Sequence, residues 1–208
     1  MMREQRRVRR SSLLFLLFLS VASPLCADFK IMGGVSFSRY GISPEAGGVQ
    51  PDYTFGWAGG IGFEKNLNYF MLLELDILYF QKGSSLESLG VAYSETKYRL
   101  NVLSLPILLR AKLLYESSPY MVGGIEFSSV LSHEMLQKEQ EPVDLKASTR
   151  SFDFAFVLGC GYEIKIEEHL FFFVEVRYHL GSRNILVDPL DGESRKTRAV
   201  VILFGLRS

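Results

Sequence analysis

The chain has 208 residues, a formal net charge of zero, 48 % apolar residues and 18 glycines, a composition that excludes a disordered or collagen-like protein. Its two cysteines exclude a disulfide scaffold, and no cluster of Cys and His has the spacing of a metal site, so neither metal nor cofactor is expected. The one long apolar run, Leu13–Leu19, is shorter than the roughly 18 residues that a spanning helix needs. A helical membrane protein is therefore not expected.

Residues 1–27 have the three parts of a secretory signal peptide. Five arginines come first, the apolar run follows, and a small residue, Ala27, precedes the expected cleavage point. A single spanning helix and a lipoprotein signal ending at Cys26 are the alternatives. The segment holds five of the 23 bases and one of the 23 acids, so a domain of residues 28–208 carries a net charge of −4. This acidic balance argues against nucleic acid as a partner.

The rest of the chain alternates apolar residues with small or polar ones. Phe55 and Trp57, for example, alternate with Gly56 and Ala58. A period of two marks strands with two different faces, and about ten such residues match a tilted strand that crosses a bilayer. We therefore predict an all-β fold, an eight-stranded antiparallel up-and-down transmembrane β-barrel. Its strands lie near residues 29–38, 53–64, 68–82, 97–113, 121–131, 152–165, 170–180 and 197–207.

The fourth of these segments changes phase. Its apolar positions are Leu100 and Val102 before Pro106, but Ile107 and Leu109 after it. A proline inside a strand marks a bulge or an edge, so the change predicts a bulge at the proline.

The connections alternate in length. The long ones are residues 39–52, 83–96, 133–150 and 182–195, and the short ones are 65–67, 116–119 and 166–168. Short periplasmic turns and long external loops are typical of a barrel in the outer membrane of a diderm bacterium. A soluble lipocalin-like barrel or sandwich is the alternative.

Aromatic residues fall where the two membrane interfaces are expected. Such residues form girdles at both interfaces of membrane barrels. The outer girdle would contain Tyr53, Tyr79, Tyr98, Phe152 and Tyr178, and the periplasmic girdle Phe29, Phe63, Tyr69 and Tyr162.

The polar face of the strands carries acids and bases in nearly equal number. Buried charges persist only when they are paired, and eight strands leave an interior that side chains fill, so a salt-bridged plug is predicted. A narrow ion path is the alternative. The predicted interior network consists of Glu74, Asp76, Arg110, Lys112, Glu126, Asp153, Glu163, Lys165, Glu175, Arg177, His179 and Arg207.

No catalytic site is expected. His179 with Ser182 and Asp188 would be a candidate Ser-His-acid set, but His179 falls on the inward face of its strand, away from an acyl chain in the membrane. The lone cysteine of the barrel domain, Cys160, falls on the lipid face as a small apolar residue.

Two blocks of sequence carry a resemblance to a family. The strand Leu100–Lys112, followed by Pro119–Gly124, resembles paired strands of the PorT-like outer-membrane β-barrel proteins, and Glu175–Gly181 resembles their seventh strand. The resemblance implies an eight-stranded barrel that the outer-membrane assembly machinery inserts. One branch of the family assists protein secretion.

These features leave two classes of function. The first is a structural or binding barrel among outer-membrane lipid and lipopolysaccharide, with external loops that engage a protein partner. The charged stretch 132–150 is the main candidate loop. The second class is a small pore or an accessory subunit of a transport or secretion machine.

Overall fold

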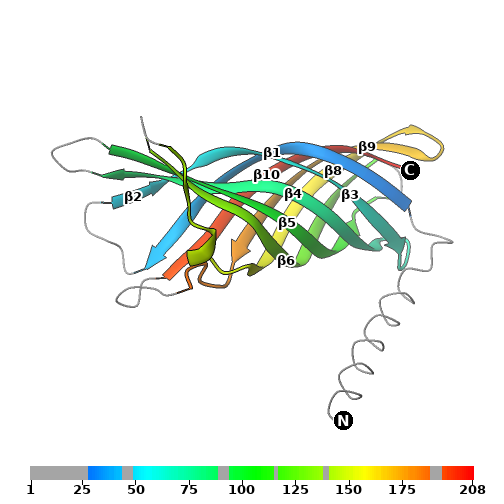
Figure 1. Cartoon of the computed structure of the whole chain (residues 1–208). Helices are drawn as coiled ribbons and strands as arrows, with labels where there is room; N and C mark the ends of the chain where they lie inside the picture. Colours follow the sequence, from blue (N-terminus) through cyan, green and yellow to red (C-terminus); the bar gives the residue numbers. More distant parts are fainter. Residues whose placement is uncertain (1–27, 44–48, 89–93, 115–116, 138–140, 188–193) are drawn as a thin grey trace, which may run out of the picture.

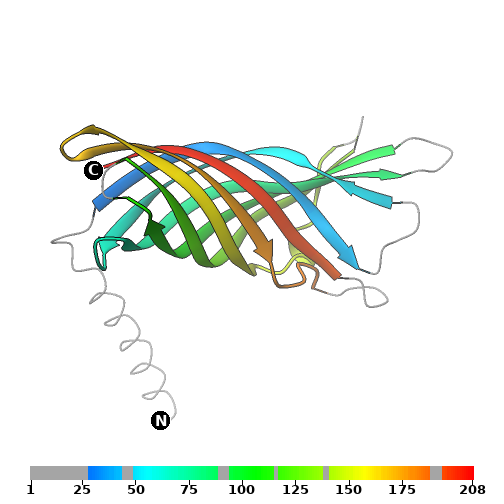
Figure 2. The ribbon, with the colours of Figure 1, turned by 180° about the vertical axis from the view of Figure 1, so that it is seen from behind.

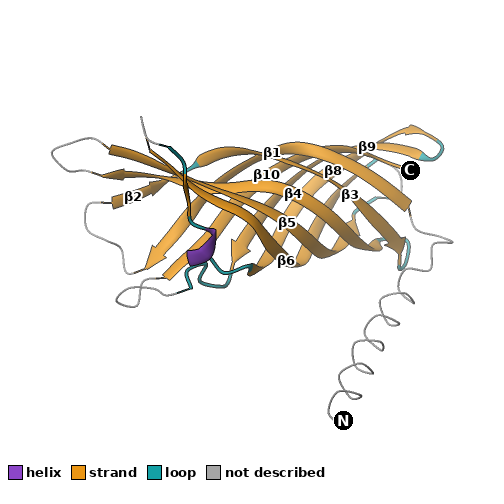
Figure 3. Ribbon diagram, in the orientation of Figure 1, coloured by secondary structure: helices purple, strands orange, loops and turns teal. Residues whose placement is uncertain are grey.

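The computed structural model describes residues 28–43, 49–88, 94–114, 117–137, 141–187 and 194–208. These residues form one sheet that closes into a barrel of strongly tilted strands (Figure 1). The wall consists of β1 (Asp28–Ser43), β3 (Thr54–Asn66), β4 (Met71–Ser88), β5 (Ser94–Lys112), β6 (Ser118–Gln137), β8 (Phe152–Glu167), β9 (Leu170–Gly181) and β10 (Ser194–Arg207). Two short strands and a 3-10 helix supplement it (Figure 3): β2 (Val49–Asp52), β7 (Val143–Asp144) and η2 (Lys146–Ser148). Among the described residues, no helix is long and apolar enough to cross a membrane.

The wall closes because β10 pairs with β1. All eight neighbouring pairs of wall strands are antiparallel, and Figure 2 shows β10 beside β1. The start of β1 and the C-terminus lie at one end of the barrel, which we call the periplasmic end. The turns that join β3 to β4 and β8 to β9 lie at the same end. The predicted eight-stranded antiparallel barrel is confirmed.

The registers of the strands fix the stagger of the barrel. Successive partners lead from Phe29 through Phe63, Leu75, Ile107, Ile125, Phe156, Leu180 and Arg198 to Arg39. The circuit thus returns to β1 ten residues beyond its start. A stagger of this size in eight strands requires a steep tilt, and it brings residues far apart in the sequence to the same height in the interior.

Apolar side chains cover the outside of the wall. Trp57 and Leu158 are 63 % and 68 % exposed, whereas their neighbours Ala58 and Val157 point inward and are buried. An exposed apolar belt of this extent is what a lipid-facing wall requires.

Two glycines allow the strands to approach closely. A Cβ atom on Gly60 or on Gly124 would lie 2.1 Å from a backbone oxygen of the neighbouring strand. A side chain at either position would therefore push the wall open.

Strand β5 does not change phase, so the bulge predicted at Pro106 is wrong. Leu100, Val102 and Pro106 all face the interior in one unbroken alternation. The shift in register between β5 and β6 lies at Asn101 and Val102 instead. The apparent change of phase arose because the outer part of the interior is itself apolar, so apolar residues mark opposite faces in the two halves of this strand.

The strands extend beyond the barrel at its outer end. Residues 82–88 of β4 pair with residues 94–100 of β5, and β2 pairs with the end of β4. This sheet projects past the other strands at the left of Figure 1. Parts of the predicted loops 39–52, 83–96 and 133–150 are therefore strand. The signal peptide predicted for residues 1–27 lies outside the described residues.

Candidate functional site

We call the half of the interior that lies nearer the periplasmic end the lower half. It holds a dense network of buried charges, centred on two arginines. Arg177 contacts Asp76 at 2.7 Å and Glu74 at 2.5 Å, and also Glu175. Arg110 lies 2.9 Å from Glu74 and 3.4 Å from Glu175. Because these side chains are buried, every acid here depends on a neighbouring base for its stability.

Further bases complete this network, which we call the lower charge cluster. Lys30 lies 2.9 Å from Asp76, Lys112 2.5 Å from Glu163, and Arg207 3.4 Å from Glu163. The cluster comprises five acids and five bases, namely Glu64, Glu74, Asp76, Glu163, Glu175, Lys30, Arg110, Lys112, Arg177 and Arg207. The formal charges of these ten groups cancel, and Arg207 also pairs at 2.9 Å with Asp28, an acid at the mouth that is partly exposed.

Aromatic rings line this cluster. The Arg110 guanidinium lies 4.2 Å from the ring centre of Tyr120, and that of Arg207 lies 4.2 Å from the ring centre of Phe171. These stacked rings fill the space between the arginines and the wall, and they stabilise the cations in the absence of water.

A second, smaller group of polar side chains lies nearer the outer end, and we call it the upper charge cluster. Glu126 accepts hydrogen bonds from Lys82 at 3.0 Å and Ser128 at 2.7 Å, and its other oxygen lies 2.6 Å from Nδ1 of His179. Asp153 accepts a hydrogen bond of 3.0 Å from Thr197.

Apolar side chains lie between the two clusters on several strands, whereas on β9 the inward residues Arg177 and His179 follow one another directly. On β4, Leu78 and Phe80 separate Asp76 from Lys82, and on β10 Val201 and Leu203 occupy the same level. These four apolar side chains, which we call the apolar layer, have no exposed surface. Within the described residues, no ion pair joins the two clusters across this layer.

The structure brings eleven of the twelve predicted network residues into the interior. Lys165 is the exception, because β8 reaches the periplasmic end at this residue and leaves its side chain exposed. Lys30, Glu64 and Lys82 belong to the network but were not predicted. Each has the inward parity of its strand, so the alternation already contained the signal.

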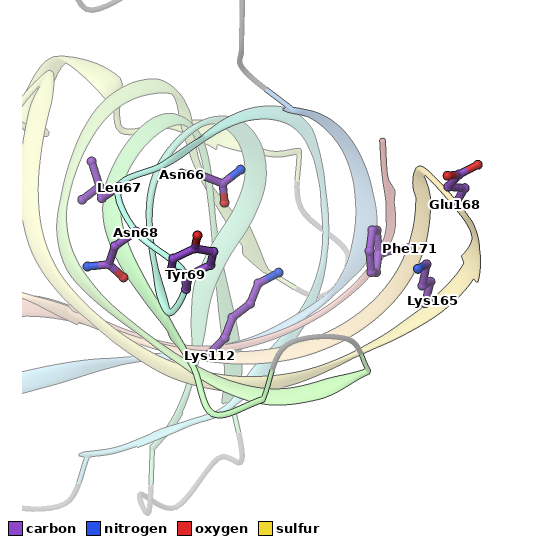
Figure 4. Close-up of a pocket in the computed structure, with 8 residues that line it drawn as sticks. All are labelled: Asn66, Leu67, Asn68, Tyr69, Lys112, Lys165, Glu168 and Phe171. Atoms are coloured by element: carbon purple, nitrogen blue, oxygen red, sulfur yellow. The ribbon is translucent and has the colours of Figure 1, made fainter.

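The periplasmic mouth contains a cavity of about 530 Å³ (Figure 4). The turn Asn66–Tyr69 forms one side of it, and Lys112, Lys165 and Phe171 form the other. The lower charge cluster lies directly above, since Lys112 is also the partner of Glu163. The cavity is therefore a vestibule that ends at buried ion pairs.

The outer end of the barrel is closed by a hydrogen-bonded histidine. Thr149 donates to the carbonyl of Leu145 at 2.9 Å, so its Oγ1 accepts from Nδ1 of His133 at 2.6 Å. Nε2 of His133 then accepts from the Tyr40 hydroxyl at 3.2 Å. Because burial and the charge of Arg195 disfavour the protonated ring, the pKa of His133 is lowered to about 4.

This arrangement corrects two predictions. His133 lies on β6 and is buried, although the sequence placed it in a loop. Tyr98 faces inward against Tyr40 and His133, with ring centres 6.1 and 6.0 Å apart, so it does not belong to the lipid-facing girdle. The aromatic residues Tyr53, Phe152 and Tyr178 are exposed on the outside, as expected.

The hydrogen-bond ladder between β3 and β4 ends before the outer ends of these strands, and we call this gap the break in the wall. Strand β3 pairs with β4 only from Ala58 onward, and β4 pairs with β2 only from Ser85 onward. Two serines of β1 bridge the intervening part of β4. Ser38 accepts from the backbone N–H of Gly83 at 2.7 Å, and Ser36 donates to the carbonyl of Gln81 at 2.5 Å.

A cavity of about 440 Å³ lies at this break. Its lining combines aromatic side chains of β3, among them Phe55 and Trp57, with Lys97 and Arg99 of the projecting sheet. The cavity is lined by exposed side chains such as Phe55 on the outside, and on the inside it reaches the buried Lys82 of the upper charge cluster.

A comparison of the sequence with models of known families identifies the family to which this barrel belongs. Residues 23–187 match the model of the outer membrane protein beta-barrel domain. The chain belongs to this family. It is thus a β-barrel protein of the outer membrane of a Gram-negative bacterium, and its wall is surrounded by outer-membrane lipid and lipopolysaccharide.

Solved structures of outer-membrane proteins are similar to this chain, and the first of them, OprG, shows the same fold. OprG from Pseudomonas aeruginosa is 16 % identical, with a TM-score of 0.51 over 88 % of this chain and 96 % of that chain. Neisserial surface protein A is 9 % identical, with a TM-score of 0.47 over 86 % and 95 %. Ail of Yersinia pestis is 11 % identical, with a TM-score of 0.40 over 88 % and 100 %. No curated protein matches the sequence.

The described residues contain no group of three or more His, Cys, Asp or Glu side chains that could hold a metal ion. His179 is bound to Glu126 in the interior, and Ser182 lies exposed at the end of β9. Asp188, the third member of the candidate catalytic set, lies outside the described residues.

Proposed function

We propose that this protein is a closed, non-conducting barrel with a structural or binding role at the cell surface. The observation that supports the proposal best is the filled interior. The lower charge cluster is held by its own ion pairs, Lys82 pairs with Glu126 in the upper cluster, and apolar side chains such as Leu78 and Leu203 occupy the level between them. Moving a hydrated ion through such an interior would require breaking several buried ion pairs.

The outer end of the molecule is the part suited to binding. The projecting sheet of β4, β5 and β2 extends beyond the membrane belt, and η2 and β7 add to it. Loops and extensions on a rigid barrel are where recognition sites occur. We propose that a protein partner in the envelope contacts this region, which includes the described part of the charged stretch 132–150.

The resemblance to PorT-like proteins supports the same proposal in its finer form. Their relatives depend on the outer-membrane assembly machinery for insertion, and we propose this route here. A role as an accessory subunit of a secretion machine is the second candidate, because it too would use an external surface and not a pore. The hydrogen bond between His179 and Glu126 inside the barrel favours a role without catalysis.

Electrical recording tests the proposal. The purified protein is refolded in detergent, its folding is verified by a shift in gel mobility on boiling, and it is added to a planar bilayer in KCl. We expect no discrete conductance steps. A salt-dependent step that changes in Arg177→Gln, but not in the exposed control Arg183→Gln, would establish the pore instead.

A further inference from the structure

The outer edge of the apolar belt carries cations on two neighbouring strands, β1 and β10, and a tyrosine just before the adjacent strand β3. On β1, Phe37 is followed on the same face by Arg39, and on β10, in reverse order, Val200 is followed by Arg198 and Lys196. On β3 and the residue before it, Phe55 is followed by Tyr53. The wall therefore changes from apolar to cationic at one level, which is the level of lipid headgroups in the outer leaflet.

Two of these cations are paired directly across neighbouring strands. Arg39 is the register partner of Arg198, and Lys196 is the partner of Gly41. Side chains at such positions lie on one face with Cβ atoms about 5 Å apart, and like charges there destabilise the sheet. Within the described chain, no carboxylate lies within 4 Å of the charged groups of Arg39, Lys196 or Arg198. An external anion would remove this repulsion.

The backbone makes room for the guanidinium groups. A Cβ atom on Gly41 would lie 3.2 Å from Nε of Arg198, so the absence of a side chain there lets Arg198 lie across β1. The guanidinium of Arg39 lies 4.9 Å from the ring centre of Tyr53. Tyr53 in turn lines the cavity at the break in the wall, which also contains Phe55 and Trp57. Cations thus lie beside a surface that accepts apolar groups.

We propose that Arg39, Lys196 and Arg198 form a clamp for a phosphorylated glycolipid headgroup of the outer leaflet, of the lipid A type. Two guanidinium groups side by side bind phosphate oxygens in pairs, and the lysine supplies a third charge. The acyl chains of such a lipid lie along Phe37 and Phe55, directly below the clamp. This binding site is independent of whether the barrel conducts.

The single tryptophan provides the readout. Trp57 is exposed on the lipid face and belongs to the same cavity as Tyr53. Diphosphoryl lipid A in detergent is titrated into the detergent-solubilised full chain, and its binding is followed by Trp57 emission and by native mass spectrometry. Phosphatidylglycerol and inorganic phosphate are titrated in parallel.

We expect lipid A to saturate the protein at a concentration about tenfold lower than phosphatidylglycerol, and inorganic phosphate alone to leave the emission unchanged. The double variant Arg39→Gln, Arg198→Gln should lose about tenfold in affinity for lipid A. The matched variant Lys146→Gln, Arg183→Gln removes two exposed cations of the outer end and should bind as the parent does. Gly41→Val keeps all charges but crowds Arg198, and should weaken binding as well.

Three results would overturn the clamp. The first is that the Arg39, Arg198 double variant binds lipid A as tightly as the parent. The second is that the matched variant loses as much affinity for lipid A as this double variant does. The third is that the parent binds phosphatidylglycerol as tightly as lipid A. Each variant is first shown to fold by its gel mobility before boiling, so a loss of binding is not confused with a loss of structure.

Discussion

The lower charge cluster and the apolar side chains above it fill the barrel interior in different ways. The lower half contains ten charged groups that cancel, whereas the level above it is filled by apolar side chains such as Phe80 and Val201. Both arrangements fill the interior with side chains. The lower half obtains its order from directional ion pairs, and the apolar layer obtains it from packing, so the two regions should respond differently to substitution.

The lower half should be the more sensitive of the two. A buried ion pair contributes little net stability, but removing one partner leaves the other charge buried and uncompensated. The apolar layer loses only the packing of the deleted atoms and the volume that they filled.

The largest effect is expected for Arg177→Met. It removes one base from Glu74, Asp76 and Glu175, which then have only Lys30 and Arg110 as partners, and should reduce the free energy of unfolding by about 3–5 kcal/mol. Urea titration of the protein in lipid vesicles, followed by Trp57 fluorescence, measures it. The exposed control Arg183→Met should change stability by less than about 0.5 kcal/mol. A loss below about 1 kcal/mol for Arg177→Met would show that the cluster is hydrated.

Removing a side chain from the apolar layer should cost less. Leu203→Ala is expected to lower the free energy of unfolding by about 3 kcal/mol, from lost transfer energy and the cavity left behind. The same titration applies. Leu206→Ala on the lipid face of the same strand is the control, and should lose half as much or less because lipid fills the space. Equal losses would mean that the interior is as fluid as the lipid.

The outer end should respond to pH through His133. Its pKa is about 4 in the folded protein and about 6.5 when unfolded, so the unfolded chain binds more protons below pH 6.5. The native state should lose on the order of 2 kcal/mol between pH 7 and pH 5 from this residue, about 1 kcal/mol more between pH 5 and pH 4, and little further below pH 3. The comparison is the difference in pH dependence between the parent and His133→Gln. Identical pH profiles of stability for the two proteins would contradict a neutral, hydrogen-bonded His133 ring.

The smallest effect is expected at the break in the wall. Ser38→Ala removes the acceptor for the backbone N–H of Gly83 and should cost about 1 kcal/mol. It should also speed amide exchange at Gly83, measured by NMR in micelles. Exchange at the ladder-bonded residues of β10 provides the internal reference, and equal protection before and after the substitution would show that another group closes the break.

The fold was predictable from the sequence because each wall strand has two different environments. Alternation at Phe55, Gly56, Trp57 and Ala58 reports a lipid face and an inner face, and this local signal repeats eight times. It failed in β5, where Leu100 and Val102 face an apolar part of the interior. An apolar residue indicates only an environment without water. It does not indicate which side of the wall the residue faces.

The candidate sites were predictable in part. Parity identified which charges point inward, but not that Arg177 reaches Asp76, because that pairing depends on the stagger of the whole barrel. The burial of His133 depends on Tyr40 and Thr149, which lie 93 and 16 residues away. The juxtaposition of Arg39 and Arg198 required the closing register of β1 with β10.

The sealed interior is tested most directly by thiol accessibility at Val157, which belongs to a second buried apolar group with Leu108 and Val122. Val157 has no exposed surface and tolerates a cysteine of similar size, so Val157→Cys is made in a chain with Cys26→Ala and Cys160→Ala. Exposed Ser182→Cys in the same background gives the reference rate of labelling by a small, charged thiol reagent. We expect Val157→Cys to resist the reagent until the protein is unfolded by boiling. Labelling in the folded barrel at a rate near that of Ser182→Cys would contradict the account, because water would then fill the interior.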